Sequence, residues 1–281
     1  GGGVRLLGIP SALDRLIQQA LLQVMTPIFD PDFSPCSFGF RPGKRAHDAV
    51  KQAQKYIQEG YNWVVDMDLE KFFDRVNHDM LMARVARKVK DKRILKLIRA
   101  YLNAGVMVDG SYEDSPKGVP QGGPLSPVLS NIMLNELDKE LERRVHKFVR
   151  YADDCMILCK SKRGAERTCE SITKFIEERL FLKVNREKTH VGYIGSGMKY
   201  LGYSFYVKNG KCRLGIHAKT KANFKSKLKE LTGRSNGMGY EQRKKALKEY
   251  MRGWMAYYKL ADGKNFLQKV DEWYRHRLRM C

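Results

Sequence analysis

Two short acidic stretches hold the residues best suited to chemistry. Residues 148–158, FVRYADDCMIL, place Asp153 and Asp154 side by side between two apolar runs. Like charges held this close repel, and each raises the free energy needed to ionise the other. Residues 64–76, VVDMDLEKFFDRV, carry Asp66 and Asp68 on a strand-like run. Because strand side chains alternate between faces, Asp66 and Asp68 share one face, with Asp68 at the strand's end.

If the Asp153–Asp154 turn lies beside that strand end, three carboxylates converge in a chain of formal net charge +22. A divalent cation is the obvious balancing charge, and Mg²⁺ prefers carboxylate oxygens together with substrate phosphates. Two such ions can activate a 3′-hydroxyl and stabilise a leaving pyrophosphate during an in-line displacement. Asp-Asp is also a common turn dipeptide, and Asp68 fits a surface position, so these residues alone leave both interpretations open.

The composition favours a nucleic-acid partner. Lys and Arg number 53 against 31 Asp and Glu in 281 residues, and the excess rises toward the C-terminus. Such a balance suits a polyanion, nucleic acid first and an anionic membrane surface second. No apolar stretch is long enough to span a bilayer, and the start, GGGVRLLGIP, is typical of a loop cut from something longer rather than of a signal peptide. We therefore expect an intracellular protein with no membrane partner.

The cysteines predict reduced thiols rather than a metal site. No CxxC pair and no histidine at zinc-binding spacing accompanies them in the sequence. The six residues are Cys36, Cys155, Cys159, Cys169, Cys212 and Cys281. Cys155 and Cys159 fall in a strand-like run, where a buried hydrophobic role is the more common one.

The spacing of apolar residues predicts an α+β fold with a small, mostly antiparallel sheet backed by helices. Residues 10–29 are expected to form a helix that begins at a Ser11 cap and ends at Pro27. Its apolar stripe comprises Leu13, Leu16, Ile17, Ala20, Leu21 and Val24. Further helices are expected within 37–57 and around 78–88, 90–103, 126–145 and 164–180, and strands near 61–69, 182–184, 198–206 and 211–215.

The chain becomes basic and helical from about residue 217. Three helices are predicted, at 217–231, 240–260 and 264–280, joined by short Gly-containing loops. We therefore predict two domains, residues 1–216 and residues 217–281.

Five motifs occur in one order along the chain. They are DLEKFF at 68–73, PQGGPLSP at 120–127, YADD at 151–154, LKVNREKT at 182–189 and YLGYSF at 200–205. That order resembles the reverse transcriptases. Three further stretches, SFGFRPGKRAHDAV at 37–50, RYADD at 150–154 and RGWMAYYKL at 252–260, narrow the resemblance to the group II intron-encoded reverse transcriptase/maturase family of bacteria and organelles.

The resemblance implies a right-hand polymerase fold. Partial fingers and a palm would occupy residues 1–216, and an all-α, three-helix basic thumb, also called the maturase X domain, would occupy residues 217–281. Asp68, Asp153 and Asp154, with the backbone carbonyl of Leu69, match the ligands of two Mg²⁺ ions. Lys188 matches a lysine proposed to donate a proton to the leaving pyrophosphate, although one solvated lysine among many is the alternative.

The resemblance also assigns residues that would contact the substrate. Phe73 matches the bulky residue under the incoming sugar, where a 2′-hydroxyl would clash, so the site should prefer dNTPs; Phe72 is expected in the core. Arg5 matches the fingers arginine that grips the triphosphate through its planar donor fork. Ala152 is small, which suits a base pair packing over the turn.

Two loops complete the expected site. Gln121 matches the residue near the 3′-hydroxyl of the nucleotide, and Gly122 lets the backbone approach closely. Ser126 fits the cap of the following helix. A primer grip is implied at Tyr200, Leu201 and Gly202. The helical spacing of Trp254, Tyr257 and Tyr258 favours core packing over stacking on bases.

The expected activity is therefore RNA-directed DNA synthesis from dNTPs on an RNA template with a DNA primer, together with binding of the host group II intron RNA. A splicing-only maturase, a retron or diversity-generating reverse transcriptase, and an RNA-dependent RNA polymerase are the alternatives. The family normally carries more fingers sequence before GGGVR, so whether this chain alone polymerises is left open. A bacterial cytoplasmic location is expected, and a dimer is permitted but not located.

Overall fold

The computed structural model describes residues 10–104, 106–108, 111–113, 118–119, 122–233 and 236–279, with the backbone alone for 106–108 and 111–113. Arg5, Gln121 and Cys281 lie outside the described residues. The described chain forms two compact units. One holds the residues up to Ala49 with Trp63–Gly192, and the other holds Val50–Asn62 with the residues from Tyr193 onward. The division groups the late strands with the basic helices, and the domain boundary predicted at residue 216 stays a prediction.

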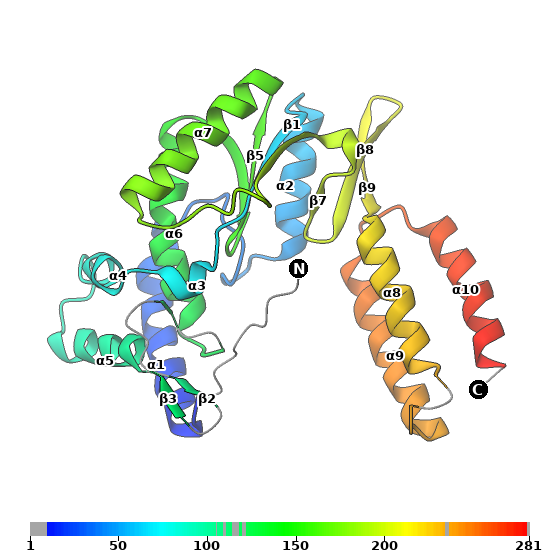
Figure 1. Cartoon of the computed structure of the whole chain (residues 1–281), viewed down its shortest axis with the longest axis horizontal. Helices are drawn as coiled ribbons and strands as arrows, with labels where there is room; N and C mark the ends of the chain where they lie inside the picture. The colour runs from blue at the N-terminus through cyan, green and yellow to red at the C-terminus, as the bar shows by residue number, and fades with distance from the viewer. Residues whose placement is uncertain are drawn as a thin grey trace. The chain divides into compact units, whose positions relative to one another are not determined.

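A four-stranded sheet organises the first unit (Figure 1). Its strand order is β4 (Lys147–Tyr151), β5 (Asp154–Cys159), β1 (Trp63–Met67) and β6 (His190–Tyr193). Strand β5 pairs antiparallel with β4 on one side and with β1 on the other. The run CMILC forms the buried part of β5, as a continuous apolar run of strand length predicts.

Helices cover this sheet. Helices α6 (Ser126–Arg143) and α7 (Lys162–Arg179) pack against the strands, and α1 (Ala12–Phe29) and α4 (His78–Val85) pack against α6. The remaining elements of the unit are η1 (Asp30–Asp32), the first part of α2 (Ala46–Gln58), α3 (Phe72–Arg75), α5 (Lys92–Asn103), β2 (Val106–Val108) and β3 (Ser111–Glu113). One apolar core runs through the unit and includes Met25, Met133 and Ile157.

Helix α1 corrects two expectations from the sequence. It continues past Pro27 to Phe29, because burial of Met25 and Phe29 offsets the hydrogen bond that proline cannot donate. The face that it buries carries Gln18, Leu21, Met25 and Phe29. The predicted stripe is wrong at Leu13, Leu16 and Val24, which are 63–68% exposed, and at Ala20, which is also exposed. This helix is apolar on most sides, so residue spacing alone does not select the packed face.

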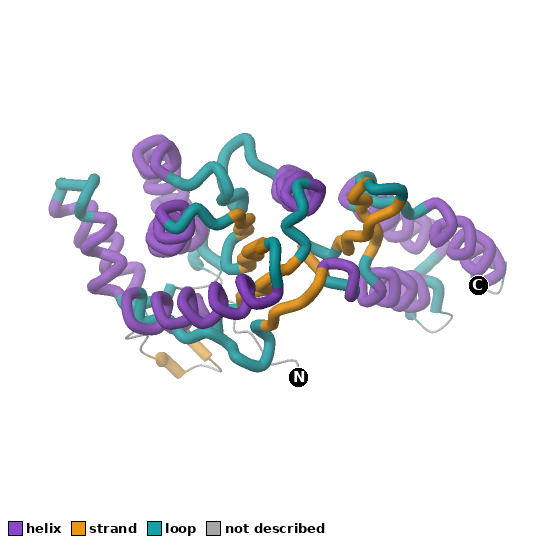
Figure 2. The backbone as a smooth tube through the Cα atoms, turned by 90° about the horizontal axis from the view of Figure 1, so that it is seen from above, coloured by secondary structure: helices purple, strands orange, loops and turns teal. Residues whose placement is uncertain are grey.

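The second unit combines a three-stranded antiparallel sheet with the later part of α2 and three C-terminal helices (Figures 1 and 2). The strands are β7 (Lys199–Tyr200), β8 (Tyr203–Lys208) and β9 (Lys211–Ile216), and the 3₁₀ turn η2 (Ile194–Ser196) precedes them. The helices are α8 (Ala218–Leu231), α9 (Tyr240–Tyr257) and α10 (Lys264–Leu278), close to the three predicted segments. Among the described residues, no helix combines the length and apolarity that crossing a membrane requires.

Candidate active site

The register of the central sheet brings two of the predicted carboxylates together. Met67 at the end of β1 pairs with Cys155 of β5. The ladder ends at this pair, with Asp68 one residue beyond it on the β1 side and Asp154 one residue before it on β5. Continued by one residue, the antiparallel register would set Asp68 and Asp154 opposite each other on one face. Asp68 and Asp154 therefore lie at the same end of the sheet.

Asp153 occupies the turn next to them. Tyr151 pairs with Asp154, which leaves Ala152 and Asp153 as the two turn residues of the β4–β5 hairpin. Ala152 takes the left-handed conformation with φ of 57° and is 9% exposed. Asp153 and Asp154 are both half-buried. The hairpin thus carries one acidic residue in its turn and a second at the start of β5.

The segment Val184–Thr189 fixes the backbone of Asp68. The Asn185 amide donates to the Asp68 carbonyl at 2.9 Å, and the Asp68 amide donates to Thr189 Oγ1 at 3.1 Å. The same segment brings Lys188 Nζ to 4.0 Å from Asp68 Oδ2, with 63% of the lysine side chain exposed. The structure therefore places the predicted Lys188 beside a predicted carboxylate, while its role as a proton donor stays a prediction.

Leu69 and Glu70 follow Asp68 and differ in how they are held. Leu69 forms an isolated bridge with Val184, whose hydrogen bonds use the Asp68 carbonyl and the Glu70 amide rather than the Leu69 carbonyl. The Glu70 carboxylate lies 2.9 Å from Lys183 and 2.8 Å from Arg75. Bonding to Lys183, with Arg75 as a second partner, lowers the pKa of Glu70. The Glu70 carboxylate thus forms ion pairs with two cationic side chains.

Phe73 and the loop before α6 are joined through the backbone. Val119 donates to the Phe73 carbonyl at 2.5 Å, and Gly118 donates to the Val76 carbonyl at 2.9 Å. Phe72 is 2% exposed and packs edge-on against the half-buried Phe73, with ring centroids 5.2 Å apart. Phe72 is a core residue, as the sequence predicts.

The start of α6 corrects one prediction. Gly122 is exposed and takes the left-handed φ of 109°. The N-cap residue of α6 is Leu125, which makes no side-chain cap, and Ser126 is the first helical residue. The prediction that Ser126 caps the helix is therefore wrong, since the turn from Gly122 brings the chain into the helix one residue earlier.

A buried ion pair that the sequence reasoning missed supports the acidic turn. The side chains of Arg150 and Asp138 are both fully buried and form a two-point pair at 2.6 and 2.7 Å. Arg150 Nη1 also donates to the Ala152 carbonyl at 2.7 Å and to Asn131 Oδ1 at 3.0 Å. The available signal in the sequence was a charged residue inside an apolar strand. The turn is thereby tied to helix α6.

The loop of residues 34–41 closes on the same turn. Asn131 Nδ2 donates to the Gly39 carbonyl at 2.9 Å. A Cβ atom built on Gly39 would overlap the backbone nitrogen of Ala152. Only glycine therefore fits here, and backbone from residue 39 packs directly on the hairpin.

The predicted primer grip lies in the second unit, in the turn between β7 and β8. Leu201 and Gly202 take left-handed φ values of 49° and 84°. Tyr257 Oη donates to the Leu201 carbonyl at 3.0 Å, and Thr220 Oγ1 donates to the Gly202 carbonyl at 3.0 Å. A Cβ on Gly202 would overlap Tyr258 Oη. Helices α8 and α9 thus hold the turn, and its role toward a primer stays a prediction.

Comparison with known proteins decides the family. Residues 1–205 match the family described as "Reverse transcriptase (RNA-dependent DNA polymerase)". Residues 221–281 match the "Group II intron, maturase-specific domain". The chain belongs to the group II intron reverse transcriptase/maturase family. The sheets and helices therefore match a reverse transcriptase palm and fingers with a helical thumb at α8–α10, while the predicted domains 1–216 and 217–281 stay a prediction.

The chain is similar in sequence to longer proteins from other organisms. Protein YkfC of Escherichia coli (strain K12) is 32% identical over an alignment of 248 positions, which covers 75% of this chain and 65% of that protein. The group II intron-encoded protein LtrA of Lactococcus lactis subsp. cremoris is 29% identical over 269 residues, with 73% of this chain and 45% of that protein covered. The chain thus spans about half to two thirds of the length of these relatives.

A solved structure supports the fold. Apo telomerase from Candida tropicalis aligns with a TM-score of 0.55 and 14% sequence identity, over 91% of this chain and 53% of that chain. At this identity the likeness shows a shared fold and nothing about substrates.

The oxygen donors of the reverse transcriptase site suit Mg²⁺. Asp68, Asp153 and Asp154 supply carboxylates at one end of the palm sheet, and the Leu69 carbonyl lies outside the hydrogen bonds of its bridge. Within the described part of the chain, no three His, Cys, Asp or Glu side chains form a ready-made metal site. Mg²⁺ commonly binds through one or two carboxylates plus substrate phosphates, so a closed protein cage is not required. The residues present therefore fit the ion, and the ligand assignment stays a prediction.

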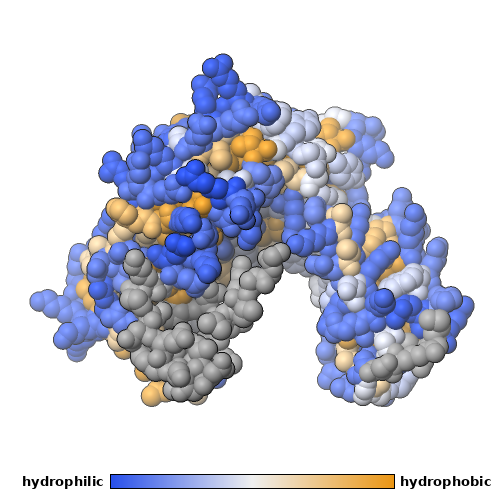
Figure 3. All heavy atoms as spheres, viewed as in Figure 1, coloured by the Kyte–Doolittle hydropathy of each residue, from blue (hydrophilic) through white to orange (hydrophobic). Residues whose placement is uncertain are grey.

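The thumb carries a large share of the positive charge. Residues 217–281 contain 17 of the 53 Lys and Arg residues but only 6 of the 31 Asp and Glu residues. Hydrophilic side chains cover most of the visible face of α8–α10 (Figure 3). Beneath them, Trp254 stacks on Phe224 with ring centroids 4.0 Å apart, and Tyr258 packs on Trp254 at 4.6 Å. The aromatic residues of the maturase segment therefore pack with one another, as their spacing predicts.

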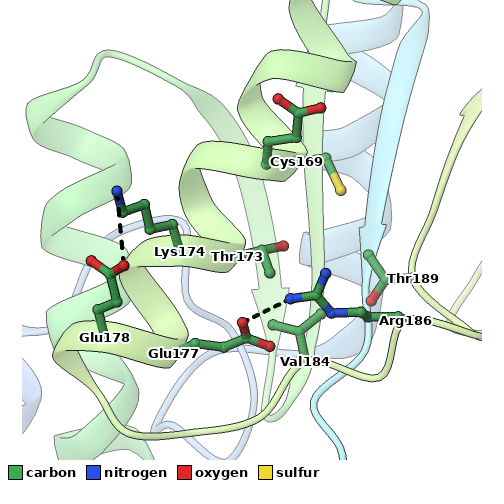
Figure 4. A pocket seen from close by; sticks show the side chains of 9 residues that line it. Cys169, Thr173, Lys174, Glu177, Glu178, Val184, Arg186 and Thr189 are labelled. Atoms are coloured by element: carbon green, nitrogen blue, oxygen red, sulfur yellow. Dashed lines mark hydrogen bonds and ion pairs between the residues drawn. The ribbon is translucent and has the colours of Figure 1, made fainter.

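A separate cavity lies on the palm between α7 and residues 184–189 (Figure 4). Its volume is about 460 Å³. The charged residues that line it include two ion pairs, Arg186 with Glu177 at 2.9 Å and Lys174 with Glu178 at 3.8 Å. Burial raises the pKa of the Cys169 thiol, which disfavours the nucleophilic thiolate. The Cys169 thiol is therefore poorly suited to act as a nucleophile.

Proposed function

We propose that this chain carries the polymerase site of an RNA-directed DNA polymerase, which adds dNTPs to the 3′-hydroxyl of a DNA primer on an RNA template. The observation that supports the proposal is the register of the palm sheet, because the β1–β5 pairing ends at Met67 and Cys155, next to Asp68 on one strand and Asp154 on the other. It is supported by the reverse transcriptase match over residues 1–205.

In this proposal Asp68, Asp153, Asp154 and the Leu69 carbonyl hold two Mg²⁺ ions. When bound, such ions activate the attacking 3′-hydroxyl and stabilise the leaving pyrophosphate. Lys188, at 4.0 Å from Asp68, holds a proton for that pyrophosphate. Ala152 leaves room for the terminal base pair.

Selection of the sugar is assigned to Phe73. Its backbone is fixed by Val119 and its ring rests against the buried Phe72, so the ring cannot easily move aside. A 2′-hydroxyl would meet this ring, and dNTPs are therefore preferred over NTPs. Arg5 and Gln121, outside the described residues, are proposed to contact the triphosphate and the 3′-hydroxyl, and Gly122 is proposed to let the backbone approach the nucleotide closely.

The second proposed role is binding of the host group II intron RNA to promote splicing and mobility. It is supported by the maturase-specific match over residues 221–281 and by the excess of 17 basic over 6 acidic residues in 217–281. Each neutralised phosphate releases counterions and makes binding weaken with salt. The same match favours the intron type over a retron or diversity-generating enzyme.

Primer extension on an RNA template with Mg²⁺ and dNTPs tests the first role. We expect Asp153→Asn to lower the extension rate by roughly 10²–10³-fold or more, the usual scale for losing one main electrostatic group of a site. Asp66→Asn is the matched control, because Asp66 lies on the same strand without a proposed metal role. Equal rates for Asp153→Asn and wild type would refute the site.

Splicing of the host intron tests the second role. Charge reversal of exposed lysines on α8, such as Lys225 and Lys229, should weaken intron RNA binding and splicing, while Asp153→Asn leaves both intact. Loss of splicing in Asp153→Asn alone, with intact splicing in the charge-reversal variants, would refute the separation of the two roles.

A further inference from the structure

The loop of residues 34–41 holds one exposed aromatic side chain between two fixed points. The first fixed point is Arg41, whose side chain is only 6% exposed. Its guanidinium pairs with Asp30 at 2.7 Å and donates to the carbonyls of Ser34 at 2.5 Å and Ser37 at 2.9 Å. Position 41 is therefore locked to the loop and to η1.

The second fixed point is the contact of the loop with the catalytic hairpin. Phe38 donates to the Arg150 carbonyl at 2.8 Å, and Arg150 donates to the Cys36 carbonyl at 2.9 Å, so the loop pairs with β4. Gly39 packs against the Ala152 backbone with no space for a side chain. The loop thus reaches the hairpin immediately before residue 40.

Phe40 lies between these points in a conformation that an L-residue rarely adopts. Its φ is 55°, yet its side chain is 60% exposed and gains little from burial. Its ring centroid lies 6.1 Å from that of Tyr151, the first residue of the YADD motif. Phe38, two residues earlier, is by contrast 6% exposed and packed under Lys44. Strained backbone that presents an exposed residue at an active site points to a functional contact.

We propose that the Phe40 ring is a stacking contact for a nucleobase at the catalytic hairpin. The ligand chemistry is the flat face of a base, which stacks on an aromatic ring whatever its sequence. The base belongs either to the template–primer duplex or to the incoming nucleotide. This inference rests on the proposed polymerase site, because the hairpin gives Phe40 its location.

The test exploits the left-handed backbone at residue 40. Phe40→Gly removes the ring and also relieves the strain, since glycine accepts positive φ at no steric cost. Its urea-unfolding midpoint should therefore equal or exceed that of the wild type, and any loss of function cannot come from unfolding. Phe40→Trp keeps a stacking surface. The matched control is Phe181→Gly, because Phe181 also has positive φ (54°) and is 67% exposed but lies outside the loop–hairpin contact.

Binding is measured with a fluorescein-labelled RNA template–DNA primer duplex, with and without dNTP, on the full chain. Phe40→Gly should raise the Kd of the duplex, or the KM for dNTP, by about 5- to 150-fold, the range found for losing one base–aromatic stack. A change in Kd identifies a base of the duplex, and a change in KM alone identifies the base of the nucleotide. Phe40→Trp should stay near wild type.

Two results separate this inference from the proposed function. If Asp153→Asn abolishes extension but Phe40→Gly matches wild type in both Kd and KM, the polymerase site stands and the stacking contact is refuted. If Phe40→Gly weakens duplex binding while Asp153→Asn extends normally, the contact stands and the catalytic assignment fails. An equal loss in Phe181→Gly would also refute a contact specific to Phe40.

Discussion

Replacing Arg150 by methionine should strongly destabilise the palm. Arg150 and Asp138 are fully buried and paired at 2.6 Å, so the substitution leaves a buried carboxylate without its cation. Breaking a buried ion pair in this way costs about 3–5 kcal/mol. Because each 1.4 kcal/mol is about tenfold in equilibrium, amide hydrogens of β1, β4 and β5 that exchange through global opening should exchange about 100-fold to several thousand-fold faster.

The double variant Arg150→Met/Asp138→Val separates stability from positioning. Replacing both buried charges by apolar residues of similar combined volume is often neutral, so most of the lost unfolding free energy should return. The donor to the Ala152 carbonyl is still missing, and a hydrogen bond from a charged donor contributes about 1.5–3 kcal/mol. We therefore expect the double variant to have a stable palm but to extend primers about 10- to 100-fold more slowly than the wild type. This factor follows from the lost hydrogen bond, because each 1.4 kcal/mol corresponds to about tenfold.

The control is a surface pair of the same chemistry. Arg99 and Asp79 lie 2.5 Å apart with side chains 39% and 82% exposed, and Arg99→Met should cost less than about 1 kcal/mol. If Arg150→Met costs no more than Arg99→Met, the buried pair does not support the palm. If the stable double variant extends primers at the wild-type rate, the pair does not position the hairpin.

Three further predictions test other parts of the structure. Gly202→Ala should lower the unfolding free energy of the second unit by about 1–3 kcal/mol in urea unfolding, because the new Cβ would overlap Tyr258 Oη and because residue 202 has a φ of 84°. Adding Tyr258→Phe should recover part of this loss, since it removes the overlapping oxygen. No recovery in the double variant would contradict the clash. Hydrogen bonding to Arg143, with Arg144 as a second partner, lowers the pKa of Glu140 from 4.5 to about 2. The ionised carboxylate therefore stabilises the fold above pH 4.5, and this stabilisation disappears as the pH falls toward 2. Glu140→Gln should therefore lower the unfolding free energy by about 1 kcal/mol at pH 7 and leave it unchanged near pH 2, and an equal effect at both would contradict the assignment. Phe73→Ala should raise incorporation of NTPs relative to dNTPs in primer extension, whereas an unchanged ratio would remove Phe73 from sugar selection.

Much of the fold was predictable because its elements carry their own local signals. The apolar run of β5, the Asp-Asp turn before it and the three basic C-terminal helices form where the sequence places them. Strand β6 was missed because HVGY has no alternating apolar pattern and its residues are half-buried or exposed. The packed face of α1 was misjudged because Leu13 and Leu21 satisfy the same helical spacing, and only contact with α6 distinguishes them.

The sequence motifs predicted which residues belong to the candidate site, but not how these residues are held together in space. The motifs supplied the acidic residues and Lys188, and the structure brings Lys188 to Asp68. The residues that hold the hairpin were missed, because Arg150, Asp138 and Gly39 meet only through tertiary contacts between segments far apart in the chain. A buried charge is detectable in sequence as an arginine within an apolar strand, but its partner is not.

The hydrogen bonds around the acidic residues explain how the fold tolerates neighbouring like charges. The contacts that fix Asp68 and the hairpin act on backbone atoms: Asn185 and Thr189 bond the backbone of Asp68, and Arg150 bonds the Ala152 carbonyl. Their formation does not depend on whether the carboxylates are ionised. These backbone bonds do not use the carboxylate oxygens, so we expect them to stay in place when the aspartates are replaced by asparagine. For this reason a loss of primer extension in Asp153→Asn reports on the missing carboxylate oxygen rather than on a collapsed palm.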